Sequence, residues 1–161
     1  MKKEVRLYNV LFPIWLLVWI PSFLWLALIP ANYFVDRFVL YKSLSEDIDR
    51  KDFCNKNAHK ICAVGFFCDF IGSALMFLTL YLTGEDYRLA NAISFDPFSD
   101  LRALFIVMVM IFASGLLIYL IDKKVLTKAG LDAKQARRSA LFLAVFTAPY
   151  LFLVPSNWLY I

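Results

Sequence analysis

The chain has 161 residues, of which 61% are hydrophobic, 17% aromatic and 19% charged. Water-soluble domains contain fewer apolar residues and about 25% charged ones, so this balance excludes an ordinary soluble domain. The formal net charge is +4. The cations lie in short segments between apolar stretches, so the charge predicts no nucleic-acid partner.

Four stretches carry at most one charged residue each: about 8–35, 61–84, 102–121 and 139–161. Roughly 20 helical residues cross a bilayer core about 30 Å thick, so each stretch is long enough for one crossing. None alternates like the strands of a barrel. The sequence therefore predicts one integral membrane domain over 1–161, an all-α polytopic helical bundle of about four transmembrane helices.

The first of these stretches, 8–35, is interrupted by Pro13, Pro21 and Pro30. Two arrangements follow: a proline-kinked span, or a segment that dips into the bilayer and returns. In a variant of the second, a helix restarts after Pro21 and continues through residues 36 and 37.

Residues beyond position 33 predict a helix that lies in the membrane interface. Apolar side chains recur there at helical spacing, opposite a polar set that includes Asp36 and Arg37. The apolar set is Phe34, Val35, Phe38 and Val39, and the other polar members are Lys42 and Ser43. The stretch 42–60 then combines mixed charge with few large apolar residues, which predicts a solvated cytoplasmic linker.

Helix boundaries are marked by capping residues farther along the chain. Ser99 and Asp100 precede the third stretch, and Asp132 follows a stop signal at Gly130. We expect the third helix to begin after Asp100 and the fourth to begin near Asp132.

The distribution of Lys and Arg predicts the orientation. Six lie in 37–60 and six in 123–138, against three in 1–6 and two in 87–102, which sum to the 17 of the chain. Cytoplasmic loops carry the excess of cations, so 36–60 and 122–138 are expected on the cytoplasmic side of the membrane. The side of the amino terminus depends on whether 8–35 spans or re-enters.

Asp69 is the single charge within 61–84 and the first candidate site residue. A carboxylate near a helix centre costs about 2.5–3.5 kcal/mol on insertion scales, so it is expected to face the bundle interior. Three roles stay open for Asp69. It could be a polar brace that bonds to a hydroxyl, to an amide or to Arg37. It could instead bind an ion or a proton, or contact another subunit. Asn32 and Asn157 are further candidates, because both follow a proline in similar L-x-L-[IV]-P-[AS]-N motifs.

Small residues predict where the helices pack together. In lipid, small side chains allow helix backbones to approach closely. The expected packing face comprises Gly65, Gly72, Ser73, Ala140, Ala144 and Ala148.

Signatures of soluble catalysis are missing from the sequence, and the chain is predicted to be non-enzymatic. It has no P-loop, G-x-S-x-G or H-E-x-x-H motif. The three cysteines form no C-x-x-C pair, and Asp52, Cys54, His59 and Cys62 match no familiar zinc spacing. We therefore predict no metal, no cofactor and no catalytic residue.

Four patches carry a resemblance: LFPIWLLVWIP, IPANYFVDRFVL, GFFCDFIGSAL and APYLFLVPSNWLY. Over roughly a third of the chain, they are similar to uncharacterised short multi-pass membrane proteins of low-GC Gram-positive bacteria. The resemblance implies a bacterial plasma membrane and supplies no activity or site residue.

Two functions of different class follow from these observations. One is an accessory or structural component of a membrane assembly, with the lipid bilayer and a membrane protein or a second copy as partners. The alternative is a small oligomeric transporter or channel subunit that uses Asp69. An intramembrane enzyme is a third alternative.

Overall fold

The computed structural model describes residues 25–83, 85–156 and 158, and over these ranges the chain is helical with no strand. The sequence-based expectation of an all-α chain is confirmed. The α-helices are α1 (Trp25–Ser43), α2 (Arg50–Leu82), α3 (Tyr87–Phe95), α4 (Leu101–Lys128) and α5 (Ala133–Phe146). Two short 3-10 turns, η2 (Pro97–Ser99) and η3 (Tyr150–Leu153), complete the fold.

Three of these segments are long and apolar enough to cross a membrane: α2, α4, and Ala133–Leu153, which contains α5 and η3. Less than half of each apolar window is buried within the protein. Large apolar side chains such as Phe77, Phe112 and Phe146 point outward instead. In water such faces would be strongly unfavourable, whereas lipid accommodates them, so the chain has the character of a membrane protein.

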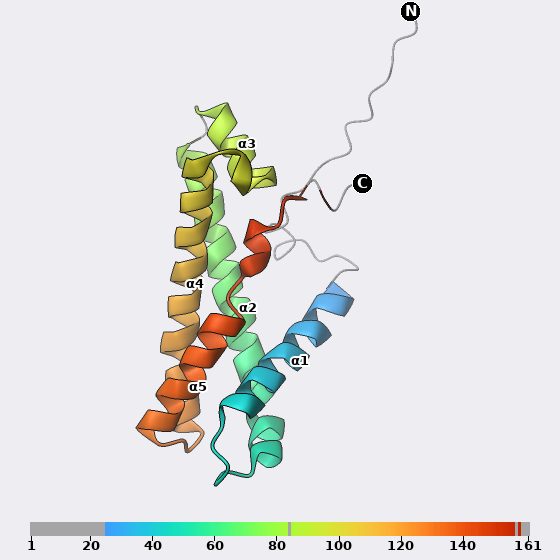
Figure 1. Cartoon of the computed structure of the whole chain (residues 1–161), viewed down its shortest axis with the longest axis vertical. Coiled ribbons are helices and arrows are strands. Elements are labelled where there is room, and N and C mark those ends of the chain that lie inside the picture. Colours follow the sequence, from blue (N-terminus) through green and yellow to red (C-terminus); the bar gives the residue numbers. More distant parts are fainter. Residues whose placement is uncertain (1–24, 84, 157, 159–161) are drawn as a thin grey trace, which may run out of the picture.

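The described part of the chain has two distinct ends (Figure 1). The segments that join α1 to α2 and α4 to α5 lie together at one end, and α3 lies at the other. At the first of these ends, Gln135 of α5 links α5 to the end of α1. Its Nε2 donates to the Ser43 carbonyl at 2.8 Å, and its Oε1 accepts from Ser45 Oγ at 2.5 Å. Both strongly basic segments of the sequence therefore meet at the same end of the bundle.

The linker expected over 42–60 is helical in its second half, because α2 begins at Arg50. Asp49 caps this helix by accepting a hydrogen bond from the backbone N–H of Asp52 at 3.1 Å. Lys56 Nζ then pairs with Asp52 Oδ2 at 2.7 Å, one turn farther on. A cap and a charge pair stabilise a helix that has few apolar residues, so low apolar content alone does not exclude a helix here.

The predicted starts of the later helices are confirmed. Asp100 is the N-cap of α4 and accepts from the Arg102 N–H at 2.9 Å. Asp132 caps α5, after Gly130 has turned the chain with a φ of 102°. The ends differ from expectation, since α4 continues seven residues past 121 to Lys128 and α5 stops at Phe146. Pro149 accounts for the early stop, because a proline disfavours helix in the residue before it.

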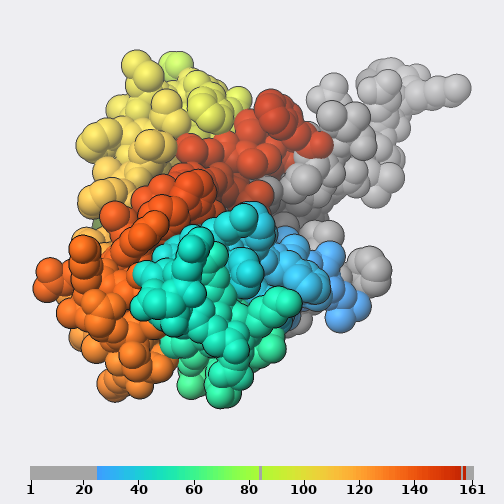
Figure 2. Space-filling view, turned by 60° about the horizontal axis from the view of Figure 1, so that its bottom comes forward, coloured from blue at the N-terminus to red at the C-terminus, as the bar shows by residue number. Residues whose placement is uncertain are grey.

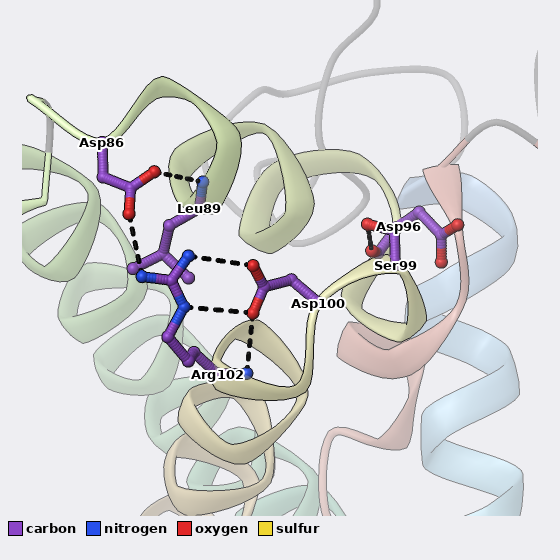
Figure 3. A network of polar contacts seen from close by, with 6 residues as sticks. All are labelled: Asp86, Leu89, Asp96, Ser99, Asp100 and Arg102. Carbon is purple, nitrogen blue, oxygen red and sulfur yellow. Dashed lines mark hydrogen bonds and ion pairs between the residues drawn. The ribbon is translucent and has the colours of Figure 1, made fainter.

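The predicted loop between the second and third membrane segments contains α3, which is held by a charged network (Figure 3). Arg102 Nη1 donates to Asp86 Oδ2 at 2.9 Å, and its Nη2 donates to Asp100 Oδ2 at 3.0 Å. Asp86 also caps α3 by accepting from the Leu89 N–H at 3.0 Å. Each of these carboxylates therefore has a cationic partner and a backbone donor.

The structure corrects the expected orientation of α1. A continuous helix does run through residues 36 and 37, as one alternative proposed, with Pro30 inside it. However, Asp36 is buried, whereas Phe34 and Phe38 are more than 60% exposed. The buried residues of α1 recur at helical spacing and form the face that contacts α2 and α5. They are Asp36, Val39, Leu40 and Ser43. The apolar residues face outward because lipid, not water, is the expected surroundings.

Small residues lie where α2, α4 and α5 come closest. A Cβ atom at Gly72 of α2 would collide with the Ser114 hydroxyl of α4. A Cβ at Gly115 would lie 3.4 Å from the Ala144 carbonyl of α5 and 3.7 Å from the Ala148 Cβ. Ser73 and Ala140 are fully buried, and Gly65 is half-buried against α1. Close backbone approach of this kind is the packing mode of membrane helices.

Candidate intramembrane acidic site

Three aspartates from three helices face the interior of the bundle. They are Asp36 of α1, Asp69 of α2 and Asp122 of α4. Asp122 has no exposed surface and Asp36 is 5% exposed, while Asp69 is half-buried with its Oδ1 atom enclosed. Residues more than 30 positions apart in the sequence therefore form one acidic site, which we call the interior acidic site.

Asp36 is positioned by contacts from α2 and from the end of α5. The hydroxyl of Thr147 and the thiol of Cys62 lie within hydrogen-bonding reach of its carboxyl group. The carboxyl lies against α2 at Gly65, where a Cβ atom would make an ordinary contact of 3.7 Å with Asp36 Oδ2. In Figure 2, α1 and α5 lie side by side, consistent with their direct contact. Asp36 is thus enclosed by α2 and α5.

Asp69 and Asp122 come from two helices that pack against each other, α2 and α4. The buried thiol of Cys68 interacts electrostatically with both carboxyl groups, and each of these interacts with Asp36. Within residues 25–83, 85–156 and 158, four enclosed polar atoms lack a hydrogen-bond partner: Asp69 Oδ1, Ser114 Oγ, and Oδ1 and Oδ2 of Asp122. All four belong to residues of α2 or α4.

No cation of the described residues neutralises these carboxyl groups. The described ion pairs all lie elsewhere, at Arg50 with Glu46, Lys56 with Asp52, and Arg102 with Asp86 and Asp100. Arg37, proposed as a partner of Asp69, donates instead to the Tyr33 hydroxyl at 3.3 Å. An enclosed carboxylate without a partner costs several kcal/mol, so the site is suited to take up a positive charge.

A multivalent metal is a poor candidate for that charge. Among the described residues, no three His, Cys, Asp or Glu side chains come together as metal ligands. The three described cysteines, Cys54, Cys62 and Cys68, are free and buried. One or two enclosed carboxyl groups can bind a proton or a monovalent cation.

The sequence-predicted candidates lie in different places. Asp69 belongs to the site, whereas Asn32 lies half-buried one turn before Asp36 and, in the described structure, has no hydrogen bond to Asp69. Asn157 lies outside the described residues.

Sequence reasoning missed Asp36 and Asp122. The helical pattern around residue 36 predicts a polar outer face that includes Asp36, and Asp122 lies just past the expected end of the third segment. The helical spacing of Ile111, Ser114, Ile118 and Asp122, all buried on α4, is the signal that identifies Asp122.

Comparison with known proteins gives no further assignment. No protein-family model matches the chain, and neither a curated protein nor a solved structure matches it significantly. A function for this chain therefore has to be inferred from the geometry of the interior acidic site.

Proposed function

We propose that this chain is a small, non-enzymatic, multi-pass protein of a bacterial plasma membrane that binds a proton or a monovalent cation within its helical bundle. In this proposal it acts as a small transporter or channel subunit. The observation that carries it is the absence of a described partner for both Asp122 oxygens, although the side chain is fully enclosed. Ionisable residues within membrane helices typically mark ion or proton pathways.

The proposed topology has four membrane segments, with 8–35 as the first and α2, α4 and α5 with η3 as the others. The basic residues of the segments 36–60 and 122–138 are placed on the cytoplasmic side, whereas Asp36 and Asp122, at the start of these segments, are placed within the membrane part of the bundle. The position of these basic residues at one end of the bundle supports this arrangement, because a common side is what the charge rule requires of them.

Neutralisation explains how the interior acidic site would act. A proton or a monovalent cation bound by one or two of Asp36, Asp69 and Asp122 reduces the cost of the buried negative charge. Its release restores that cost, so the occupied and empty states favour different helix arrangements. The close contact of Gly72 with Ser114 would couple such a change to the packing of α2 on α4.

A second candidate function is an accessory component of a membrane assembly. It is favoured by the position of the two large described cavities, of about 700 and 480 Å³, neither of which is lined by these acids. A transport path through one copy would need an opening at the site. Assembly with a membrane protein or a second copy would supply the missing walls.

Asparagine substitutions separate the two candidates. Full-length protein in liposomes is assayed for proton, Na⁺ and K⁺ flux, with Asp69→Asn and Asp122→Asn as test variants. Asp100→Asn is the matched control, because Asp100 pairs with Arg102 in the charged network beside α3 and lies outside the interior acidic site. Loss of flux in both test variants, at normal abundance and with the control active, supports the transporter. Unchanged flux with altered assembly would favour the accessory role.

A further inference from the structure

The larger cavity is a groove of about 700 Å³ on the surface between α1 and α2. Five aromatic side chains contribute to its walls, and Cys62 and Ala63 form part of its floor on α2. The aromatic residues are Trp25, Tyr33, Phe34, Phe66 and Phe70. Trp25 stacks on Phe66 with ring centroids 6.4 Å apart, which joins the two helices at the groove.

The groove is polar at one end only. His59 lines it there, and Tyr33 holds the guanidinium of Arg37 at its edge through the 3.3 Å hydrogen bond. Lys60 is exposed next to His59. Within the described part of the chain, no carboxylate forms an ion pair with Arg37 or Lys60. This end lies toward the basic segments that join the helices.

The length of the groove matches one leaflet of a bilayer. From His59 to Phe70, α2 rises about 16 Å at 1.5 Å per residue. Half of a hydrocarbon core about 30 Å thick is about 15 Å. An acyl chain that starts at the cationic end would therefore run along the aromatic walls toward the middle of the membrane.

We propose that this groove binds an anionic phospholipid of the cytoplasmic leaflet. Its acyl chain would lie between α1 and α2, and its phosphate would accept hydrogen bonds from Arg37, His59 and Lys60. Charge complementarity selects this occupant, because a zwitterionic lipid would bring its own cation to an already cationic end. The inference rests on the proposed membrane location but not on cation binding at the interior acidic site.

Native mass spectrometry of the full-length protein tests this inference. The protein is released from nanodiscs of equal parts dioleoyl phosphatidylglycerol and dioleoyl phosphatidylcholine. Wild type is expected to retain one phosphatidylglycerol in preference to phosphatidylcholine. Arg37→Gln should weaken that preference roughly tenfold, as expected for loss of a charge-assisted hydrogen bond. Lys124→Gln, on the exposed surface of α4 near the same end, is the matched charge control.

Filling the groove gives an independent readout. Ala63→Trp should abolish retention of the lipid, and the smaller Ala63→Leu should reduce it. Ala31→Trp, on the outward face of α1, should leave it intact. Equal retention of both lipids by wild type, or full retention by Ala63→Trp, would overturn the proposal. Conversion of a dimer to a monomer by Ala63→Trp, with no lipid in wild type, would assign the groove to a second copy instead.

These outcomes are distinct from those of the flux assay. Failure of lipid retention leaves the effect of Asp122→Asn on flux unchanged. Conversely, if the chain carries no cation flux, the preference of the groove for phosphatidylglycerol is still expected and is measured independently.

Discussion

The interior acidic site and the corner between α3 and α4 use the same residue type in opposite ways. At the corner, Asp86 and Asp100 both pair with Arg102 and cap helix ends (Figure 3). In the interior, both oxygens of Asp122 and one of Asp69 have no partner among the described residues. Both acids of the corner therefore have partners within this chain, whereas these oxygens of Asp69 and Asp122 have none among the described residues.

This difference separates structural acids from candidate functional ones. A carboxylate with a cation and a backbone donor stabilises the fold where it stands. An enclosed carboxylate without either destabilises the fold, and natural proteins keep such residues mainly where function needs them. We therefore expect that replacing an acid of the corner lowers the stability of the protein, whereas replacing an unpartnered interior acid raises it.

The largest expected loss of stability comes from separating the helices that enclose the interior site. Gly72→Leu would force α2 away from Ser114 of α4 and is expected to destabilise the protein by about 1–3 kcal/mol. Thermal unfolding in detergent measures the effect. Gly65→Ala is the control, because its Cβ would make only an ordinary 3.7 Å contact with Asp36. Equal losses in both variants would show that Gly72 has no special role in the packing.

A smaller loss is expected at the corner. Asp86→Leu removes the N-cap of α3 and one carboxylate partner of Arg102. We expect a lower unfolding midpoint than wild type, with a smaller decrease than that of Gly72→Leu, and faster hydrogen exchange in α3. A higher midpoint would contradict the structural role assigned to the corner acids.

The smallest effect is a pH dependence at the same corner. Side-chain hydrogen bonds from Arg102, then its backbone N–H, lower the pKa of Asp100 from 3.8 to about 2. The stabilisation from this carboxylate is therefore complete above pH 3.8 and is lost as the pH falls through about 2. Arg102→Gln should remove this contribution, so the stability difference between wild type and Arg102→Gln should shrink between pH 5 and pH 2. A constant difference would show that Arg102 does not set the titration of Asp100.

Local chemistry made part of this structure predictable. Asp100 and Asp132 were recognisable as caps because capping depends on residues three positions apart or fewer. Asp69 was recognisable because a charge inside an apolar run is conspicuous. Both signals are local in the sequence.

The rest depends on which helices meet in space. Asp36 belongs to the interior acidic site because α2 and α5 flank it, and no pattern within residues 30–40 contains that information. The helical start of α2 at Arg50 was hidden for a related reason. Composition describes solubility, whereas helix formation there follows from one cap and one charge pair.

Replacement of Asp122 by its closest apolar counterpart tests the central claim most directly. Asp122→Leu keeps the branched shape and removes two enclosed oxygens that have no described partner. The measurement is the thermal unfolding midpoint of full-length protein in detergent, in buffer free of Na⁺ and K⁺. The account predicts a rise of at least about 2 °C together with loss of cation flux. A lower midpoint would show that Asp122 stabilises the bundle and would contradict the account.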